Sequence, residues 1–461
     1  TAPGPMTAPA VRAVDPGLPV HGVRRARRAF SVVVVFTVMA ALTVGYYVAL
    51  LNGFGNLSYV TVGVAFLLGT DGLLLAFSTG RRPPPVQVGR VERQDDVSAI
   101  IACYNGADVI GETLQSLLVH VAPENIIVVS DFSTDDTARV ARSYGVRVVE
   151  NRFNRNKPLS VSRVAPMVNT RYTLVIDDDT HVGHEPIPVE LLEQGAAAVA
   201  FDVMPIETGS LVNRMQTYEY RKSMTLGKAL MSDAGAVANV SGAVGLFRTA
   251  DLRRQASLHS GHVPGEDLQR TLLSHLDSDG RGVAFSSNRV VTLAPSSWRE
   301  LYRQRAKKWG PAEHELLFLS LRLMLDPRVH YSLRYERGYS VFVLLTDPLR
   351  MLFFVTLLFS PWYFVFLYLL YLPLEGFAWW RTGRRDSPGV VLLAPIYNIF
   401  KLLARFRAHF RWFQLKWDYL FHQRYHRLVA GRNLPVEYAG IVAVLVVAWG
   451  VTVTGVVAQL T

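Results

Sequence analysis

The chain has 461 residues, half of them hydrophobic, and a formal net charge of +11 at pH 7. Its single cysteine, Cys103, excludes a disulfide framework and a cysteine-based zinc site. The composition is too apolar for an ordinary soluble protein and too polar for one made only of membrane spans, so we expect a water-facing domain joined to membrane helices.

The N-terminal part is expected to anchor the chain in a membrane. Residues 1–28 are rich in Pro and Ala and end in a basic cluster, which predicts a disordered basic tail. Residues 29–82 hold two apolar runs, 30–52 and 57–78, each long enough to span a bilayer. No small-residue cleavage site follows the first run, and basic residues flank the pair, so the positive-inside rule places both ends in the cytoplasm.

Residues 83–338 are expected to form a cytoplasmic domain, because no stretch in them is apolar and long enough to span. Short β-rich runs alternate with helical patterns, and this alternation predicts βαβ units and a mostly parallel sheet in an α/β domain. The expected strands are 97–103, 125–130, 146–150 and 172–177, and the expected helices are 108–121 and 135–144. Ligands of such sheets bind at the carboxyl ends of the strands, where Asp131 and Asp177 lie.

Three consecutive carboxylates, Asp177, Asp178 and Asp179, follow the fourth expected strand. Adjacent negative charges repel one another and cannot be buried without a counter-charge. A solvated turn at the strand end would explain them. Mg²⁺ or Mn²⁺ would explain them equally, since both prefer oxygen ligands and complete their shells with substrate phosphates.

Residues 339–461 return to a membrane pattern. The run 339–380 is long enough for two spans with a turn at Ser360-Pro361. The segment 389–413 mixes apolar residues with four cations, which predicts an interfacial amphipathic helix. A final span is expected over 438–460. Five spans make this an integral plasma-membrane protein with its C-terminus outside the cytoplasm.

Charged residues near and inside these apolar runs predict their surroundings. Asp71 lies in the second expected span, and Asp347 with Arg350 lies in the third. A polar path through the membrane and an ion pair within the helix bundle both remain open. The basic, aromatic stretch 401–432 favours contact with anionic membrane lipids rather than with nucleic acid.

Four motifs of the central domain occur in a recognisable order. They are "IIACYNGADVIGETLQSL" (100–117), "SDFSTDDT" (130–137), the Asp177 cluster and "VPGEDLQRTLL" (263–273). This order resembles the family 2 glycosyltransferases, in particular membrane-embedded polysaccharide synthases such as hyaluronan, chitin and cellulose synthases. The resemblance covers about 97–309 and implies a GT-A fold, which is Rossmann-like α/β with a mostly parallel sheet, beside an α-helical transmembrane region.

The resemblance also implies a nucleotide-sugar site. Its residues would be Tyr104, Asn105, Asp131, Lys157, Asp177, Asp178, Arg305 and Lys308. Asp131 would contact the base or ribose, while Asp177 and Asp179 would form the D-x-D pair that holds Mg²⁺ or Mn²⁺ and the donor diphosphate. Lys157 either holds the diphosphate or is simply solvated. Asp178 occupies the opposite face of an extended strand end, which favours a structural role for it.

The acceptor side follows from the last two motifs. Asp267, beside Glu266, matches the carboxylate that acts as general base in the family, although an ordinary helix N-terminus would also carry such residues. Gly242 lies in a segment that lines the acceptor path in the synthases. Trp309 matches the tryptophan of Gln-x-x-Arg-Trp, with Arg305 at the glutamine position and Lys308 at the arginine position. An interfacial anchor is the alternative for Trp309.

The resemblance therefore implies an inverting, metal-dependent glycosyltransferase that uses a nucleotide-sugar donor, expected to be UDP-linked, and synthesises and secretes a polysaccharide. The alternative is transfer of one sugar to a lipid carrier or glycolipid, which the altered tryptophan motif keeps open. A non-catalytic nucleotide-sugar sensor is disfavoured, because the metal and base carboxylates are both present. Sugar identity depends on pocket contacts that spacing does not reveal.

Overall fold

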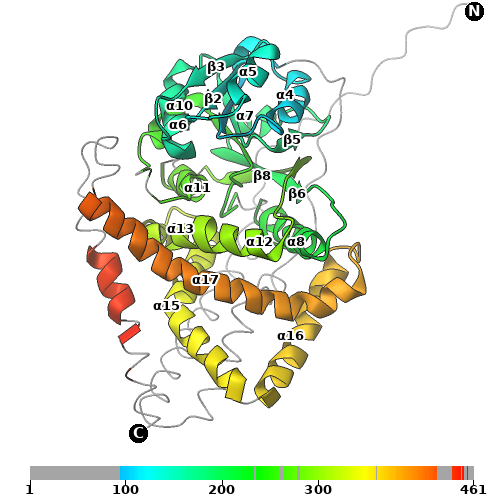
Figure 1. The fold of residues 1–461 in the computed structure, drawn as a ribbon, viewed down its shortest axis with the longest axis vertical. Helices are drawn as coiled ribbons and strands as arrows, with labels where there is room; N and C mark the ends of the chain where they lie inside the picture. The colour runs from blue at the N-terminus through cyan, green and yellow to red at the C-terminus, as the bar shows by residue number, and fades with distance from the viewer. Residues whose placement is uncertain are drawn as a thin grey trace, which may run out of the picture.

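A computed structural model describes residues 94–422 apart from 233–234, 260, 262, 278–280 and 360, together with 439–447, 449–450 and 454. The expected basic tail and the two leading spans, 1–82, lie outside these residues, as does part of the expected final span. In the described part, a sheet with covering helices occupies one end and long helices occupy the other (Figure 1).

The sheet has eight strands in the order β3-β2-β1-β4-β7-β6-β8-β5. Their bounds are β1 Val97–Cys103, β2 Ile126–Ser130, β3 Arg147–Glu150, β4 Tyr172–Ile176, β5 Thr180–Val182, β6 Ala198–Pro205, β7 Val244–Arg248 and β8 Val283–Thr292. The first four strands in this order pair in parallel. They match the four strands expected from the sequence, and they are almost entirely buried at β1, β2 and β4, as apolar strands covered on both faces should be.

The other half of the sheet is not parallel, so the prediction of a mostly parallel sheet is wrong there. β7 pairs antiparallel with both β4 and β6, and β5 pairs antiparallel with β8, while β6 and β8 are parallel. β7 begins beside the end of β4, with Val244 opposite Ile176. The chain therefore runs back through the sheet at the edge where the Asp177 cluster lies, and β7 brings the Gly242 segment to that edge.

Helices cover the sheet and position the later motifs. They are α4 Ile110–Leu118, α5 Thr137–Ser143, α6 Asn156–Val164, α7 Val189–Glu193, α8 Leu211–Lys222, α9 Ala229–Ser232, α10 Thr249–Ala256 and α11 Glu266–Asp277. Short 3₁₀ turns occur at Pro123–Asn125 and Ala165–Met167. A π-helix, η3 (Ser223–Lys228), continues α8. The helices expected at 108–121 and 135–144 are present, each shorter at both ends.

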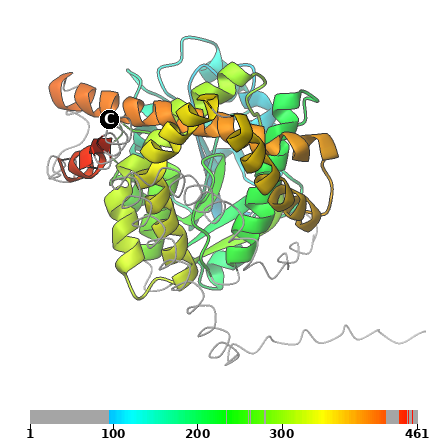
Figure 2. The same cartoon turned by 90° about the horizontal axis from the view of Figure 1, so that it is seen from below.

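The helices at the other end are α12 Trp298–Gln304, the π-helix η4 Arg305–Trp309, α13 Gly310–Glu315, α14 Leu317–Leu325, α15 Tyr331–Phe359, α16 Pro361–Arg381 and α17 Pro388–His422. α15 and α16 fall where two spans were expected. α17 packs against α8, α12, η4, α13, α15 and α16, and both views show it crossing beneath the sheet domain (Figures 1 and 2). α17 thus joins the two ends of the molecule.

Among the described residues, one helical stretch, Pro388–Asp418 of α17, is long and apolar enough to cross a membrane. It contains the segment 389–413, which the sequence predicted to lie in the interface. A polar path and an ion pair were both open for Asp347. In the structure Asp347 of α15 forms an ion pair, and its partner is Arg405 of α17, which donates to it at 2.8 and 2.9 Å. Asp347 is almost fully buried, so this pair satisfies a carboxylate inside the bundle.

Candidate active site

The loop after β1 is tied to the "SDFSTDDT" segment after β2. Asn105, in a left-handed conformation with φ 53°, accepts a hydrogen bond from the Thr134 amide at 2.8 Å and donates its own amide to Ser133 Oγ at 3.1 Å. The Gly106 amide donates to Thr137 Oγ1 at 2.9 Å. Tyr104 is 55% exposed beside this loop. The structure therefore brings Tyr104 and Asn105 to the carboxyl ends of β1 and β2, as predicted.

Asp131 is buried at the same edge of the sheet. Its Oδ1 accepts from Asn151 Nδ2 at 2.6 Å and from the Arg155 amide at 2.8 Å, and its own amide donates to the Cys103 carbonyl at 2.8 Å. These contacts fix the carboxylate between β1, β2 and the loop after β3. Phe132 adopts φ 64°, a left-handed backbone conformation that favours glycine.

Lys157 connects three parts of the site. Its ammonium forms an ion pair with Asp177, donates to the Gly242 carbonyl at 2.6 Å, and lies 3.6 Å from Glu266 Oε1. Burial alone would lower the pKa of Lys157, but the charges of Asp177 and Glu266 outweigh burial and raise it. The lysine therefore stays charged and joins the D-x-D pair to the "GED" motif. It is not simply solvated.

Asp178 faces away from this connection. Its backbone carbonyl accepts from Thr113 Oγ1 at 2.6 Å, and its carboxyl group lies beside Cys103 and Gly106. A Cβ added at Gly106 would lie 2.6 Å from Asp178 Oδ2 and 2.5 Å from Cys103 Sγ. Burial raises the pKa of the Asp178 carboxyl group. This environment matches the structural role that the sequence favoured for Asp178.

Asp179 could supply one carboxylate ligand to a cation. Its Oδ1 accepts from Thr292 Oγ1 at 3.1 Å and from Thr180 Oγ1 at 3.3 Å, which orients the carboxyl group. Burial, with the charges of Asp177 and Asp178, raises the pKa of Asp179 to about 6. A divalent cation would relieve that repulsion. Within the described ranges, no three His, Cys, Asp or Glu side chains are grouped to hold a metal. A cation held by Asp177 and Asp179 would therefore need further oxygen ligands, which substrate phosphates can supply.

Glu266 and Asp267 begin α11 and differ in charge environment. Burial alone would raise the pKa of Glu266, but Lys157 and Arg270 outweigh burial and lower it. Burial and the Glu266 charge raise the pKa of Asp267. Gly242 lies against Asp267, since a Cβ added there would be 3.2 Å from Asp267 Oδ2. One carboxylate is thus held ionised, and the other has the raised pKa that suits a general base.

The start of α11 depends on Gly265. Its φ is +118°, and a Cβ added there would lie 2.4 Å from the Ala312 Cβ of α13. We expect Gly265→Ala to destabilise the fold by roughly 2 kcal/mol or more, because both the backbone and the contact with α13 would be strained. Thermal unfolding in detergent would measure this loss. Gly195→Ala is the control, since it has a positive φ but open space around it; an equal loss there would show that the contact with Ala312 does not matter.

The tryptophan motif forms a separate surface. Trp309 is 47% exposed, the Arg305 guanidinium lies 3.5 Å from its ring centroid, and the Tyr220 ring lies 6.4 Å away. Arg305 itself is buried and donates to Glu219 Oε2 at 2.7 Å, so this side chain is held under Trp309. Lys308 is exposed beside it. The structure thus places Lys308 and Trp309 at the surface. Arg305, predicted as a nucleotide-sugar ligand, is instead bound to Glu219.

Two functional candidates were missed in the sequence. Tyr220 lies near Trp309, and burial together with the charges of Glu219, Asp179 and Asp177 raises its pKa to about 12. Tyr220 therefore packs near Trp309 and lies within electrostatic range of Asp177 and Asp179. Lys228, buried at the end of η3, has a pKa lowered to about 8 by burial, although Asp267 and Asp202 oppose that change. Neither lies in a recognised motif: Tyr220 belongs to α8, and Lys228 ends the π-helix η3, which the sequence does not reveal.

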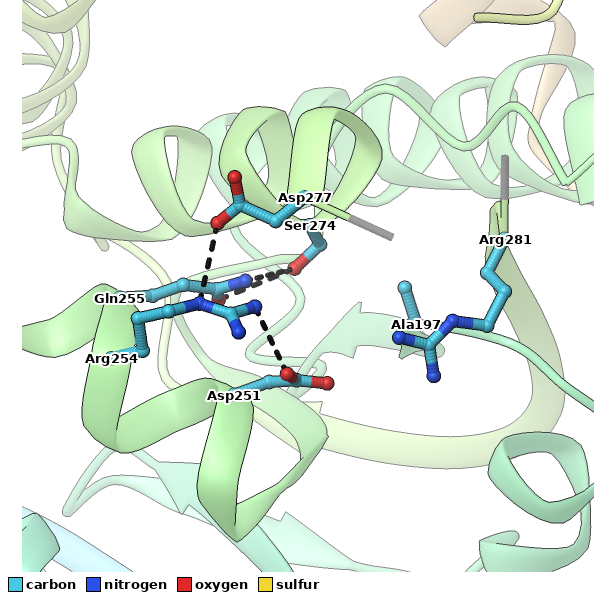
Figure 3. Close-up of a pocket in the computed structure, with 7 residues that line it drawn as sticks. All are labelled: Ala197, Asp251, Arg254, Gln255, Ser274, Asp277 and Arg281. Atoms are coloured by element: carbon cyan, nitrogen blue, oxygen red, sulfur yellow. Dashed lines mark hydrogen bonds and ion pairs between the residues drawn. The ribbon is translucent and has the colours of Figure 1, made fainter. Parts of the chain in front are cut away.

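A shallow polar pocket lies at the other end of α11 and contains none of the predicted site residues (Figure 3). In it, Arg254 of α10 contacts Asp251 at 3.0 Å and Asp277 of α11 at 3.6 Å, and Gln255 donates to Ser274 at 3.2 Å. Asp277 is ten residues from Asp267, which is about 15 Å along a helix. These contacts join the C-terminal end of α11 to α10, away from Asp267.

The comparisons with known proteins concern this same region. Residues 94–310 match the family model described as "Glycosyltransferase like family 2". Poly-beta-1,6-N-acetyl-D-glucosamine synthase of Staphylococcus epidermidis is 25% identical over 238 residues, which cover 49% of this chain and 56% of that protein. The synthase of the same name from Staphylococcus aureus is 25% identical over 240 residues, covering 49% and 57%. The match therefore spans little more than half the length of these relatives.

A solved mannosyltransferase from Pyrobaculum calidifontis, in complex with GDP-Man and Mn²⁺, aligns with 85% of this chain and all of its own, at 14% identity and a TM-score of 0.45.

Proposed function

We propose that the protein is a family 2 glycosyltransferase that builds a polysaccharide from a UDP-linked sugar at the membrane, in keeping with the match of residues 94–310 to that family model and with the names of its relatives. The observation that carries the proposal is the contact of one ammonium, that of Lys157, with both Asp177 and Glu266. Donor-binding and base-bearing carboxylates therefore belong to one site. The names of the relatives make N-acetylglucosamine the first sugar to test.

The donor half would bind the nucleotide at the carboxyl ends of β1 and β2. Asp131, which is fixed by Asn151 and the Arg155 amide, would accept from the base or ribose beside Tyr104 and Asn105. Asp177 and Asp179 would hold Mg²⁺ or Mn²⁺, which when bound neutralises the charge developing on the diphosphate leaving group. Lys157 and the exposed Lys308 are the cations available to the diphosphate oxygens.

The acceptor half would place a saccharide hydroxyl beside Asp267. Asp267 would take the hydroxyl proton as the oxygen attacks the anomeric carbon, and the nucleoside diphosphate would leave from the opposite face, which inverts the configuration. Glu266, held ionised by Lys157 and Arg270, keeps negative charge next to Asp267 and so favours its protonation. Gly242 leaves room for the acceptor next to the base, and Trp309 would stack on the preceding sugar.

We expect activity to fall on the acid side of about pH 6. Burial and Glu266 raise the pKa of Asp267 to about 6, and a base must be deprotonated to act, so transfer should rise as pH increases through that value. A pH profile of kcat/KM at saturating metal would measure this. Asp267→Glu should move the acidic limb along the pH axis; an unmoved limb in that variant would assign it to another group.

The decisive experiment uses the full chain in lipid nanodiscs with Mg²⁺ or Mn²⁺ and radiolabelled UDP-N-acetylglucosamine, followed by other nucleotide sugars. Label in a high-mass, glycosidase-sensitive fraction is the expected result. Label found only in the organic phase would favour transfer of one sugar to a lipid-linked acceptor. That second function is kept because Arg305, at the glutamine position of the motif, is engaged with Glu219, and Lys308 stands at the arginine position.

We further propose that the protein is integral to the plasma membrane, with the catalytic domain in the cytoplasm and the C-terminus outside. α15 and α16 fall where two spans were expected. α17 is taken to lie along the interface although it contains a stretch apolar enough to span, and this count of five spans leaves the C-terminus outside. Proteolysis of sealed vesicles, with an epitope at the C-terminus, would test this topology. An epitope protected inside right-side-out vesicles would overturn it.

A further inference from the structure

The carboxylate of Glu219, on α8, accepts hydrogen bonds from side chains of two other elements. It accepts from Arg305 Nη2 of η4 at 2.7 Å, from the Tyr397 hydroxyl of α17 at 2.7 Å and from Lys401 Nζ of α17 at 3.2 Å. Burial alone would raise the pKa of Glu219, but Arg305 and Lys401 outweigh burial and lower it to about 2. A single ionised side chain therefore binds η4 and α17 together.

Arg305 connects Glu219 to Trp309, because it contacts both side chains. Its guanidinium is almost fully buried, with Glu219 on one side and the Trp309 ring 3.5 Å away. A planar cation stacked on an aromatic face fixes the orientation of that ring. Trp309 is otherwise 47% exposed at the end of a short π-helix, so Arg305 is a main restraint on its position.

The backbone of this segment also lies directly on α17. A Cβ added at Gly310, the residue after Trp309, would lie 2.2 Å from the Ala408 Cβ of α17. Trp309 is therefore flanked by two attachments to α17, one through Arg305 and Glu219 and one through Gly310. Figure 1 shows α17 running beneath α12 and α13 at this level.

We propose that Glu219 is a positioning residue that fixes Trp309 to helix α17 and thereby holds the acceptor-binding surface in register with the membrane helices. The inference rests on the proposed role of Trp309 in binding the acceptor. It predicts that loss of the Glu219 charge affects acceptor use and leaves the donor half of the site intact, since the hydrogen-bond partners of Glu219 among the described residues are on η4 and α17.

The kinetic test compares Glu219→Gln with Asp386→Asn. The control breaks another ion pair of α8, that of Arg221 with Asp386 at 3.1 Å, which has no contact with Trp309. With UDP-N-acetylglucosamine and a β-1,6-linked N-acetylglucosamine oligosaccharide as probes, we expect Glu219→Gln to raise the acceptor KM about tenfold, because a displaced binding surface weakens acceptor alignment. The donor KM should stay within about twofold, and Asp386→Asn should change neither constant.

A second measurement does not depend on activity. Cys103 is the chain's only cysteine and is buried, so a spin label on Lys307→Cys, an exposed position in η4, reports that segment alone. We expect the label to become more mobile with Glu219→Gln and to stay unchanged with Asp386→Asn. If Glu219→Gln does not fold, Arg305→Lys keeps a cation for Glu219 but lacks the planar group over Trp309, and the same gain in mobility is expected.

The outcomes distinguish failure of the positioning role of Glu219 from failure of the proposed glycosyltransferase function. Unchanged label mobility, or an acceptor KM that does not rise, would overturn the role of Glu219. A mobilised label in a protein that transfers no sugar from any nucleotide donor would retain the structural contact and count against the proposed function instead. Equal kinetic losses in Glu219→Gln and Asp386→Asn would show that any weakening of α8 has the same effect, which would also overturn the proposal.

Discussion

Asp267→Asn is expected to reduce sugar transfer by about a thousandfold while leaving donor binding nearly unchanged. Loss of a positioned general base typically costs this much, and the amide has nearly the same shape as the carboxylate but cannot take the acceptor proton. Burial raises the pKa of Asp267, so the site stabilises a charged carboxylate less than water does, and a neutral amide should be tolerated there. Release of UDP and binding of UDP would be measured in parallel.

Asp277→Asn is the matched control for this experiment. Asp277 ends the same helix, α11, and contacts Arg254 in the polar pocket, away from the base. It should retain transfer within about threefold, because a half-exposed ion pair contributes little to stability. A comparable loss in both variants would indicate that α11 had shifted, and a normal rate with Asp267→Asn would remove this residue from the chemistry.

Asp179→Asn is the second large effect, with an expected loss of about a hundredfold or more in turnover. The amide can still contact Thr180 and Thr292, but it lacks the charge that would hold a divalent cation against the diphosphate. The Mg²⁺ or Mn²⁺ concentration required for UDP binding should rise in parallel. Titration calorimetry of UDP at several metal concentrations would measure that shift independently of catalysis.

Asp251→Asn, which alters a carboxylate in the polar pocket of Figure 3, serves as the charge-matched control for the metal experiment. Its metal dependence should equal that of the parent. If Asp179→Asn retained the parental metal requirement, the cation would have to be held elsewhere, and the D-x-D assignment would fail. Complete independence of metal in the parent protein would contradict the assignment more directly.

Much of the first half of the sheet was predictable. Runs such as "IIVVS" and "YTLVI" are apolar throughout, which is typical of strands covered on both faces, and the four parallel strands lie where such runs occur. The second half was not predictable in the same way. Nothing local in "VGLFR" specifies that β7 lies between β4 and β6 and runs against both, because strand order depends on pairing between segments far apart in the chain.

The same distinction applies to the site. Motif order located Asp131, Asp177, Asp179 and Asp267, which the structure brings to one edge of the sheet and to the adjoining start of α11. The side-chain contacts that join the site to α17 could not be predicted from the sequence. Glu219 and Tyr397 are separated by 178 positions, and no pattern in α8 or α17 alone indicates that they meet. For Arg305, motif position predicted a ligand of the diphosphate, whereas its partner Glu219 places it beneath Trp309.

The single ammonium of Lys157 has an evolutionary consequence. Lys157 contacts Asp177, the Gly242 carbonyl and Glu266 at once. A substitution that moves Lys157 should therefore alter both the proposed donor half and the proposed acceptor half of the site. Changes that favour a new donor and changes that favour a new acceptor therefore cannot accumulate independently near this residue. Divergence of specificity should proceed through residues away from Lys157, such as the exposed Tyr104 and Trp309.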